Sequence, residues 1–218
     1  MKIAVLGTGA VGKTIGSKLI QLGHEVKMGS RNAGGEKALT WLKEAGSNAS
    51  EGTFEDAAAF AEILFNCTAG VGSLEALQLA GAQHLANKIL VDVSNPLDFS
   101  NGMPPSLSVC NTDSLGEQIQ ATFPELKVVK TLNTMWCGLM VNPGLINGGD
   151  HQVFVAGNDG EAKKSVSTNI LNAFGWKPET ILDLGDITKA RGTEMYLPLW
   201  LSIYGATSNG AFNIKIVR

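Results

Sequence analysis

A glycine-rich string near the N-terminus limits the possible folds more than any other part of the sequence. Residues 7–12 read Gly-Thr-Gly-Ala-Val-Gly, directly after the apolar run of residues 2–6 and before a helical pattern over 11–22. In such a strand–turn–helix context, the first glycine permits a tight turn, the second lets a pyrophosphate approach the backbone, and the third lets the helix pack closely on the sheet. The string therefore predicts a dinucleotide-binding Rossmann unit, with six residues at the cofactor: Gly7, Thr8, Gly9, Ala10, Val11 and Gly12. The alternative is a glycine-rich turn that binds nothing.

The turn expected after the second strand indicates which dinucleotide would bind. Enzymes that use NAD carry an acidic residue there, about 20 residues after the glycine string, which accepts a hydrogen bond from the ribose 2′-hydroxyl. This chain instead reads Gly-Ser-Arg-Asn over residues 29–32. Arg31 can bind a 2′-phosphate through two hydrogen bonds, and Ser30 and Asn32 can donate others, so NADP is predicted rather than NAD. Lys37 is a weaker candidate for the same phosphate, because a lysine on a surface helix is usually only solvated.

The remaining pattern predicts an α/β protein of the Rossmann type, with a doubly wound parallel sheet and a small C-terminal α/β elaboration. Strands are expected over residues 2–6, 25–28, 48–51, 63–67, 89–93, 127–132, 152–156, 180–184 and 213–217. Helices are expected over residues 11–22, 35–45, 54–60, 73–80, 115–122, 160–173 and 187–204, and a loop over 96–105. We expect an NADP-binding domain over 1–148, and a smaller part over 149–218 that completes the site.

Composition limits the partners and the compartment. The 218 residues carry a formal net charge of −3, with no basic cluster suited to nucleic acid or anionic lipid. The apolar stretch from Met195 to Ala206 is too short to span a bilayer, so neither a membrane nor a nucleic acid is an expected partner. Three widely spaced cysteines without metal-ligand spacing indicate free, mostly buried thiols, no metal site and a cytoplasmic location: Cys67, Cys110 and Cys137.

The glycine string, the 29–32 turn and two later strings together resemble a known family. The later strings are ILVDVSNP (residues 89–96) and KVVKTLNTM (residues 127–135). The whole chain resembles the NADP oxidoreductases that depend on the deazaflavin coenzyme F-420, and also the reductase domain of the six-transmembrane epithelial antigen metalloreductases. The resemblance implies hydride transfer between the nicotinamide and a flavin-like ring stacked on it.

The resemblance also implies roles for individual residues. Thr8, Ser30 and Arg31 would contact the NADP phosphates. Near the nicotinamide it places Ala69 and Asn95, which follow the fourth and fifth strands, and we expect their neighbours Thr68 and Pro96 to bind the cofactor as well. The second ring would lie against a segment that follows the sixth: Asn133, Thr134, Met135 and Trp136.

The identity of the acceptor remains open at this point. The segment 133–136 stands where the deazaflavin enzymes carry a His-Thr-Ile-Pro type string, whereas the metalloreductase domain carries an Asn-Thr string like this one. FMN and FAD therefore remain alternatives to coenzyme F-420. Beyond these rings, the alternatives are an NADPH-dependent reductase of a small imine or carbonyl compound, and a module that senses NADP(H) without catalysis.

No side chain is expected to take part covalently, because hydride passes directly between two well-placed rings. The three histidines have no neighbours in sequence that suggest acid–base chemistry. Trp136 and Trp200 are candidates for walls of a ring pocket, although aromatic residues more often belong to the core. The apolar helix over residues 195–204 is expected to form a homodimer interface, with the core and the second-ring pocket as alternatives.

Overall fold

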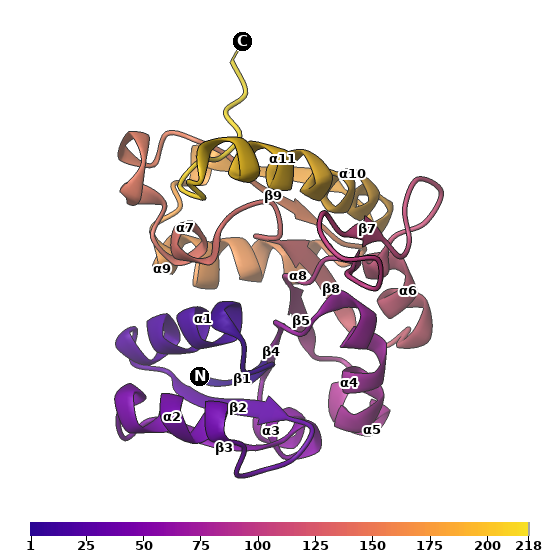
Figure 1. Ribbon diagram of the computed structural model, residues 1–218. Coiled ribbons are helices and arrows are strands. Elements are labelled where there is room, and N and C mark those ends of the chain that lie inside the picture. Colours follow the sequence, from indigo (N-terminus) through magenta and orange to yellow (C-terminus); the bar gives the residue numbers. More distant parts are fainter. Residues whose placement is uncertain (218) are drawn as a thin grey trace.

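The computed structural model describes residues 1–217 and contains a sheet of eight strands in the order β10-β9-β8-β5-β4-β1-β2-β3 (Figure 1). All neighbouring strands are parallel except β8 and β9. The strands are β1 (Lys2–Leu6), β2 (Glu25–Ser30), β3 (Ala49–Thr53), β4 (Ile63–Asn66), β5 (Ile89–Asp92), β8 (Lys127–Thr131), β9 (Val153–Ala156) and β10 (Ile181–Gly185). This confirms the predicted Rossmann-type α/β class.

Helices cover both faces of the sheet, as expected of strands that are apolar on both sides. The helices are α1 (Ala10–Gln21), α2 (Glu36–Ala45), α3 (Phe54–Phe60), α4 (Ser73–Ala80), α5 (Ala82–Leu85), α6 (Leu115–Thr122), α7 (Cys137–Val141), α8 (Gly160–Ser165), α9 (Asn172–Phe174), α10 (Ala190–Met195) and α11 (Leu197–Thr207). One hydrophobic core lies under α1, α2, α7 and the helical stretch 160–174, and it includes Ile15, Trp41 and Phe174. The other lies under α3, α4, α5 and α6, and it includes Leu77 and Ile119.

The order of the strands reverses beside β1, which pairs with β2 on one side and with β4 on the other. The chain after β1 turns into α1, while the chain after β4 turns into α4 on the opposite face. The carboxyl ends of β1, β4, β5 and β8 therefore leave a crevice at a topological switch point, where ligands bind in open α/β sheets.

The C-terminal part continues the same sheet, because β9 pairs with β8 across the proposed boundary at residue 148. The helix expected over 160–173 consists of α8, a π-helical turn over Val166–Leu171, and α9. The helix expected over 187–204 is interrupted: a 3-10 turn over Ile187–Lys189 leads into α10, and a separate α11 follows. Pro198 explains the break, since it has no N–H to donate to the carbonyl of Glu194.

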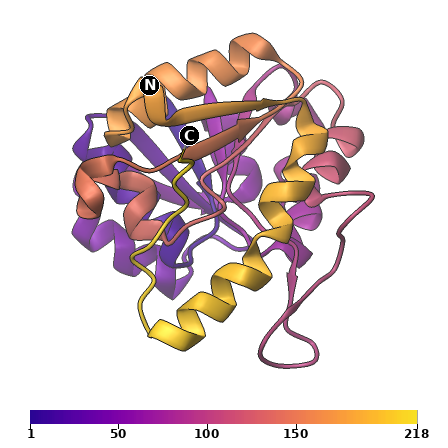
Figure 2. The ribbon, with the colours of Figure 1, turned by 90° about the horizontal axis from the view of Figure 1, so that it is seen from above.

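Two local predictions were wrong. Residues 96–105 are not wholly loop, because β6 (Leu97–Asp98) pairs antiparallel with β7 (Ser106–Leu107); the loop between these strands extends away from the body (Figure 2). Residues 213–217 form no strand. That segment instead bonds Gln152: the Gln152 N–H donates to the Ile214 carbonyl at 2.9 Å, and the Asn213 amide donates to the Gln152 carbonyl at 2.9 Å. The Asn213 side chain thus binds the Gln152 carbonyl, which a backbone N–H would bind in a strand pair.

No helix within residues 1–217 is long and apolar enough to cross a membrane.

Candidate functional site

The turn after β1 has the geometry that each glycine of the string predicts. Gly7 has φ +116°, and a Cβ there would lie 2.6 Å from the Cys67 carbonyl oxygen. A Cβ at Gly12 would lie 2.1 Å from the Gly7 carbonyl oxygen, so α1 can approach the turn only with glycine at this position. Around Gly9, in contrast, a Cβ would meet no atom within 4 Å. Gly9 therefore faces open space, as a residue against a bound pyrophosphate must.

The N-terminus of α1 fits an anion. Its N-cap residue, Gly9, provides no side-chain hydrogen bond, and the first turn contains no acidic residue. The first N–H groups of the helix thus lack a side-chain acceptor and carry the positive end of the helix dipole. Phosphate groups bind at such helix ends.

The turn after β2 places a basic side chain at the edge of the crevice. The Arg31 guanidinium is exposed and donates to a Glu75 carboxylate oxygen of α4 at 2.9 Å, while the Ser30 hydroxyl donates to the Asn32 carbonyl at 2.7 Å. Both carboxylate oxygens of Glu51 accept from the Gly34 N–H, at 3.0 and 3.2 Å, which orders the loop after Arg31.

Lys37 is exposed on α2, and the described residues provide no ion-pair partner for it. Two acids contact this turn: Glu51 binds Gly34, 17 residues away, and Glu75 binds Arg31, 44 residues away. Local sequence patterns do not indicate contacts over such separations.

The loops after β4 and β5 form the walls of a pocket of about 170 Å³. Ala69 and Asn95, which the resemblance assigns to the nicotinamide, line this pocket together with Thr68, an expected cofactor contact, and Val11 of the glycine string. The two loops contact each other closely, because a Cβ at Gly70 would lie only 2.0 Å from the Asn95 carbonyl oxygen. The structure thus brings together residues that are 84 positions apart in the sequence, Val11 and Asn95.

The segment 133–136 does not line a single cavity. Asn133 is buried and forms a reciprocal amide pair with Asn95: each side-chain NH2 donates at 2.9 Å, to the Asn133 carbonyl and to the Asn95 side-chain oxygen respectively. Thr134 faces a second, mostly apolar pocket of about 240 Å³. Met135 is buried in the core beside α7.

The second pocket lies between the sheet and α10. The residues that line it, besides Thr134, are Phe154, Leu184, Gly192, Thr193, Tyr196 and Ile214. Burial raises the pKa of the Tyr196 phenol, so this hydroxyl stays protonated at neutral pH. The pocket provides apolar walls with few polar groups, as pockets for organic rings do.

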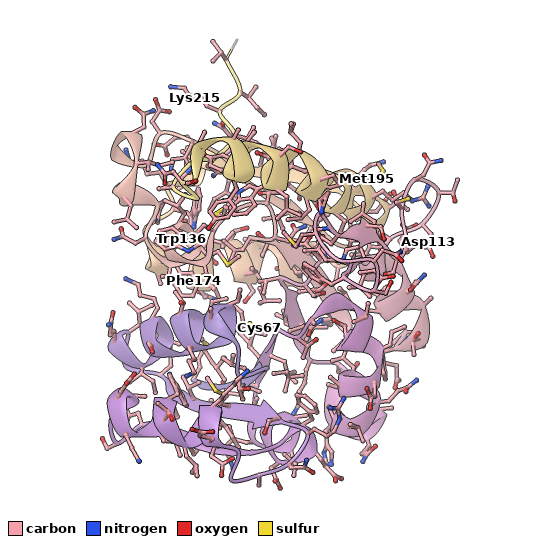
Figure 3. All side chains as sticks on the ribbon, in the orientation of Figure 1. Cys67, Asp113, Trp136, Phe174, Met195 and Lys215 are labelled. Atoms are coloured by element: carbon pink, nitrogen blue, oxygen red, sulfur yellow. The ribbon has the colours of Figure 1, made fainter. Side chains whose placement is uncertain are left out.

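Trp136 lies outside the core, with 44% of its surface exposed, beneath the end of α11 (Figure 3). It lines a groove with Trp200, Tyr204 and residues 208–211. Trp200 stacks on Tyr204 and on Phe212, with ring centroids 5.5 and 5.3 Å apart. The two tryptophans that the sequence suggested as pocket walls therefore do lie side by side, in a groove of their own.

A buried ion network beneath the crevice was missed by the sequence analysis. The Lys130 ammonium donates to Asp92 at 2.8 Å and to the Ser94 carbonyl at 2.7 Å, and it lies 2.7 Å from a Glu194 carboxylate oxygen. All three charged side chains are at most 1% exposed. The signal was present: Asp92 and Lys130 are charges inside otherwise apolar strands, and such charges must be paired when the strands are buried.

None of the cysteines forms a disulfide: Cys67 and Cys137 are half-buried, and Cys110 is exposed rather than buried as expected. Cys67 lines the pocket beside Thr68, and burial together with the negative charge of Asp92 raises the pKa of its thiol. The thiol is therefore protonated and a poor nucleophile. His151 is buried, with Nε2 2.9 Å from the Pro143 carbonyl and Nδ1 2.8 Å from the Asn213 amide, which makes it a structural residue.

Comparisons with known proteins agree with this geometry. Residues 2–96 match the family described as NADP oxidoreductase, coenzyme F420-dependent. A crystal structure of a proposed F420-dependent NADP reductase from Arthrobacter sp. FB24 is 54% identical, with a TM-score of 0.94 and all of both chains covered.

More distant proteins share parts of the chain. Metalloreductase STEAP3 of Rattus norvegicus is 31% identical over 206 residues, which are 91% of this chain but 38% of that protein. A reductive aminase from Aspergillus terreus, solved with NADPH and ethyl levulinate, shares the fold at 20% identity, with a TM-score of 0.64 over 95% of this chain and 62% of its own.

The glycine turn, the open N-terminus of α1 and a relative that matches over its full length lead to the same assignment. The chain belongs to the family of coenzyme F420-dependent NADP oxidoreductases, and it is an NADP-dependent oxidoreductase.

Proposed function

We propose that this protein transfers hydride between NADP(H) and a deazaflavin or a flavin that binds as a diffusible second substrate. The observation that carries the proposal is the adjacency of two pockets: Asn95 lines the first, Thr134 lines the second, and the amide pair between Asn95 and Asn133 joins the loops that bear them. When bound, the nicotinamide supplies the carbon that donates or accepts the hydride.

Residues from four loops would hold the dinucleotide. Gly7, Thr8, Gly9 and the first turn of α1 face the pyrophosphate, and Ser30, Arg31 and Asn32 face the 2′-phosphate, with Lys37 as an additional charge. At the nicotinamide end, the residues are Thr68, Ala69, Asn95 and Pro96. Their role is to bind and orient, because hydride transfer between planar rings depends on alignment and on the exclusion of water rather than on a protein nucleophile.

The second pocket supports a planar ring as the acceptor. Phe154, Leu184 and Ile214 provide its walls, and Thr134 provides a polar atom on the side of the nicotinamide loop. Beside it, the aromatic groove of Trp136, Trp200 and Tyr204 offers flat surfaces to a longer acceptor. One observation favours a second candidate, the reduction of a small imine or carbonyl compound: about 240 Å³ is less than the usual 300–1,000 Å³ of pockets for drug-sized ligands.

We also propose that the protein is a cytoplasmic homodimer. Helix α11 is apolar around most of its circumference, yet Leu199 is 56% exposed and Tyr204 is 46% exposed. A helix with this composition is normally covered on all sides, and a second copy of the chain would cover it. Free cysteines support a reducing compartment.

The decisive experiment is an anaerobic titration of the purified protein with NADPH, in separate cuvettes containing coenzyme F-420, FMN or FAD. Bleaching of one ring at a rate that depends on the protein identifies the acceptor class. If NADPH binds tightly and no ring bleaches, the proposed acceptors are wrong, and a panel of small imines and carbonyl compounds becomes the next test.

The preference for NADP has its own test in Arg31→Ala. We expect this variant to weaken NADPH binding by about 1.5–3 kcal/mol, the usual contribution of hydrogen bonds to a charged group, and to leave NADH binding unchanged. Isothermal titration calorimetry with both cofactors measures the difference.

Glu75→Gln is the matched control for Arg31→Ala, because it removes the negative charge that pairs with Arg31 and keeps the guanidinium. NADPH binding by this control should be equal to or tighter than that of the unmodified protein. Equal losses of NADPH and NADH affinity in Arg31→Ala would contradict the assignment of the 2′-phosphate to this residue.

A further inference from the structure

The buried side chains of Asp92, Lys130 and Glu194, called here the ion triad, pair with one another and with nearby backbone groups. The three protons of the Lys130 ammonium go to Asp92 Oδ2, the Ser94 carbonyl and Glu194 Oε1, at 2.7–2.8 Å. The Glu194 oxygens also accept from the N–H groups of Leu115 and Gly116, at 2.8 and 3.0 Å, at the N-terminus of α6. Burial disfavours the charged ammonium, but the two carboxylates outweigh it, so the pKa of Lys130 lies above its ordinary value.

Such a triad is a costly way to stabilise a fold. Each buried ion loses its hydration, and apolar side chains of similar volume often stabilise a protein equally well or better. Its benefit therefore has to be sought in the groups that it positions.

One end of the network reaches the first pocket. Asp92 Oδ1 accepts from the Asn66 amide at 2.9 Å, and from the Ser94 N–H and hydroxyl at 3.2 and 2.7 Å. Lys130 binds the Ser94 carbonyl, so both the N–H and the carbonyl of Ser94, the residue before Asn95, are held by the triad. Asn66 in turn accepts from the Thr68 hydroxyl at 2.6 Å. The network thus ends at Thr68, Ser94 and Asn95, which all line the pocket.

The other end reaches the second pocket. Glu194 belongs to α10, whose residues Gly192 and Thr193 line that pocket together with Tyr196, just beyond the helix. The ion triad therefore connects α10, on one side, to the loop that carries Asn95, on the other, without any water-exposed link.

We propose that Lys130 is a positioning residue: it holds the turn of Ser94 and Asn95 in place for the nicotinamide end of NADP(H), and it fixes α10 to that turn through Glu194. This role rests on the proposed function of the first pocket. It requires that loss of the triad weakens contact with the nicotinamide. Binding of the adenosine end, which the proposal assigns to the turn with Arg31, should remain unaffected.

The test compares two ligands, NADPH and adenosine 2′,5′-bisphosphate, the latter lacking the nicotinamide. Lys130→Met alone would leave two buried carboxylates unpaired and endanger folding. The test variant is therefore the triple substitution Asp92→Asn, Lys130→Met and Glu194→Gln, which removes all three charges. Lys127→Met is the matched control, because Lys127 lies on the same strand with its side chain 40% exposed.

We expect the triple variant to bind the bisphosphate within about twofold of the unmodified protein, and NADPH at least about tenfold more weakly, the size of effect that follows from losing one or two hydrogen bonds. The change in NADPH fluorescence on binding, which reports the surroundings of the nicotinamide, should be lost as well. Lys127→Met should match the unmodified protein in all three measurements.

Two results would overturn the proposal: unchanged binding of both ligands, or an equal loss for both. If the triple variant does not fold, Glu194→Gln serves instead, since it removes one charge while its amide oxygen can still accept a hydrogen bond from Lys130. NADPH binding weakened about threefold, with the affinity for the bisphosphate preserved, supports the proposal. Unchanged binding of both ligands overturns it. None of these measurements requires turnover. A protein that shows the expected split but reduces no ring would keep the positioning role while losing the proposed acceptor.

Discussion

Gly9 and Gly12 belong to the same string, yet a methyl group would meet very different surroundings at the two positions. At Gly12 it would overlap the Gly7 carbonyl oxygen, whereas at Gly9 it would point into open space, on a backbone with φ −75° that alanine readily adopts. The two glycines therefore separate the requirements of folding from those of binding.

We expect Gly12→Ala to lower the free energy of unfolding by about 2–4 kcal/mol, because backbone must move to admit the methyl group. Gly9→Ala should unfold at nearly the temperature of the unmodified protein but bind NADPH at least about tenfold more weakly, because the methyl group occupies the place of the pyrophosphate. Thermal unfolding and calorimetry measure the two quantities. Normal NADPH binding by Gly9→Ala would show that the dinucleotide does not cross this turn.

At the residue scale, the sequence predicted those residues whose chemistry depends on local spacing. The glycine string and the 29–32 turn could be interpreted because strand, turn and helix lie next to one another in the chain. Lys130 and Glu194 could not be paired in this way, since 64 residues separate them and they meet only through the tertiary packing of β8 and α10.

At the scale of elements, a partly buried ion pair between Arg191 and Glu117 joins α10 to α6. Arg191 of α10 donates to Glu117 of α6 at 2.8 Å, and Ser114 caps the same helix. The hydrogen bond from Arg191 holds the pKa of the Glu117 carboxyl below its ordinary value. A carboxylate with a lowered pKa stabilises the folded protein above the pKa it has when unfolded, and this contribution is lost as the pH falls through the lowered value.

We expect Glu117→Gln to lower the free energy of unfolding by about 0.5–1 kcal/mol at pH 7, the range for a partly screened pair. The two proteins should converge as the pH falls below about 4.3, the ordinary pKa of glutamate. Urea denaturation at several pH values measures the difference, with Glu62→Gln, at an exposed position, as the control. A difference that persists unchanged to pH 3 would show that the pair does not act through its charge.

The positions of most elements followed from the sequence, whereas their ends and interruptions did not. Central strands such as β4 and β5 are apolar on both faces and short, which distinguishes them from helices. The break at Pro198 depends on one missing backbone N–H, and β6 and β7 pair over only two residues each, which a hydrophobic pattern does not show.

At the scale of the whole molecule, helix α11 exposes apolar side chains such as Leu199 to solvent in a single chain. Under the proposed dimer, Leu199→Glu should convert the protein to a monomer, because the new charge would be buried against the second copy. Sedimentation velocity measures the mass. Leu39→Glu is the control, since Leu39 is an exposed leucine on the distant α2. A monomeric unmodified protein, or a Leu199→Glu dimer, would contradict the proposed interface.

Because β9 runs in the opposite direction to β8, the two pockets are lined by residues from different parts of the sequence. Because β9 runs against β8, Val153 and Phe154 extend past the last pair of that ladder, between Thr131 and Val155, and carry the sheet beyond the edge where the dinucleotide would lie. The second pocket is thus lined on one side by strands, with Phe154 of β9 and Leu184 of β10 facing it. Under the proposed function, substitutions on these two strands would change the electron acceptor, while the turn at residues 29–32, and with it the preference for NADP, would be inherited unchanged.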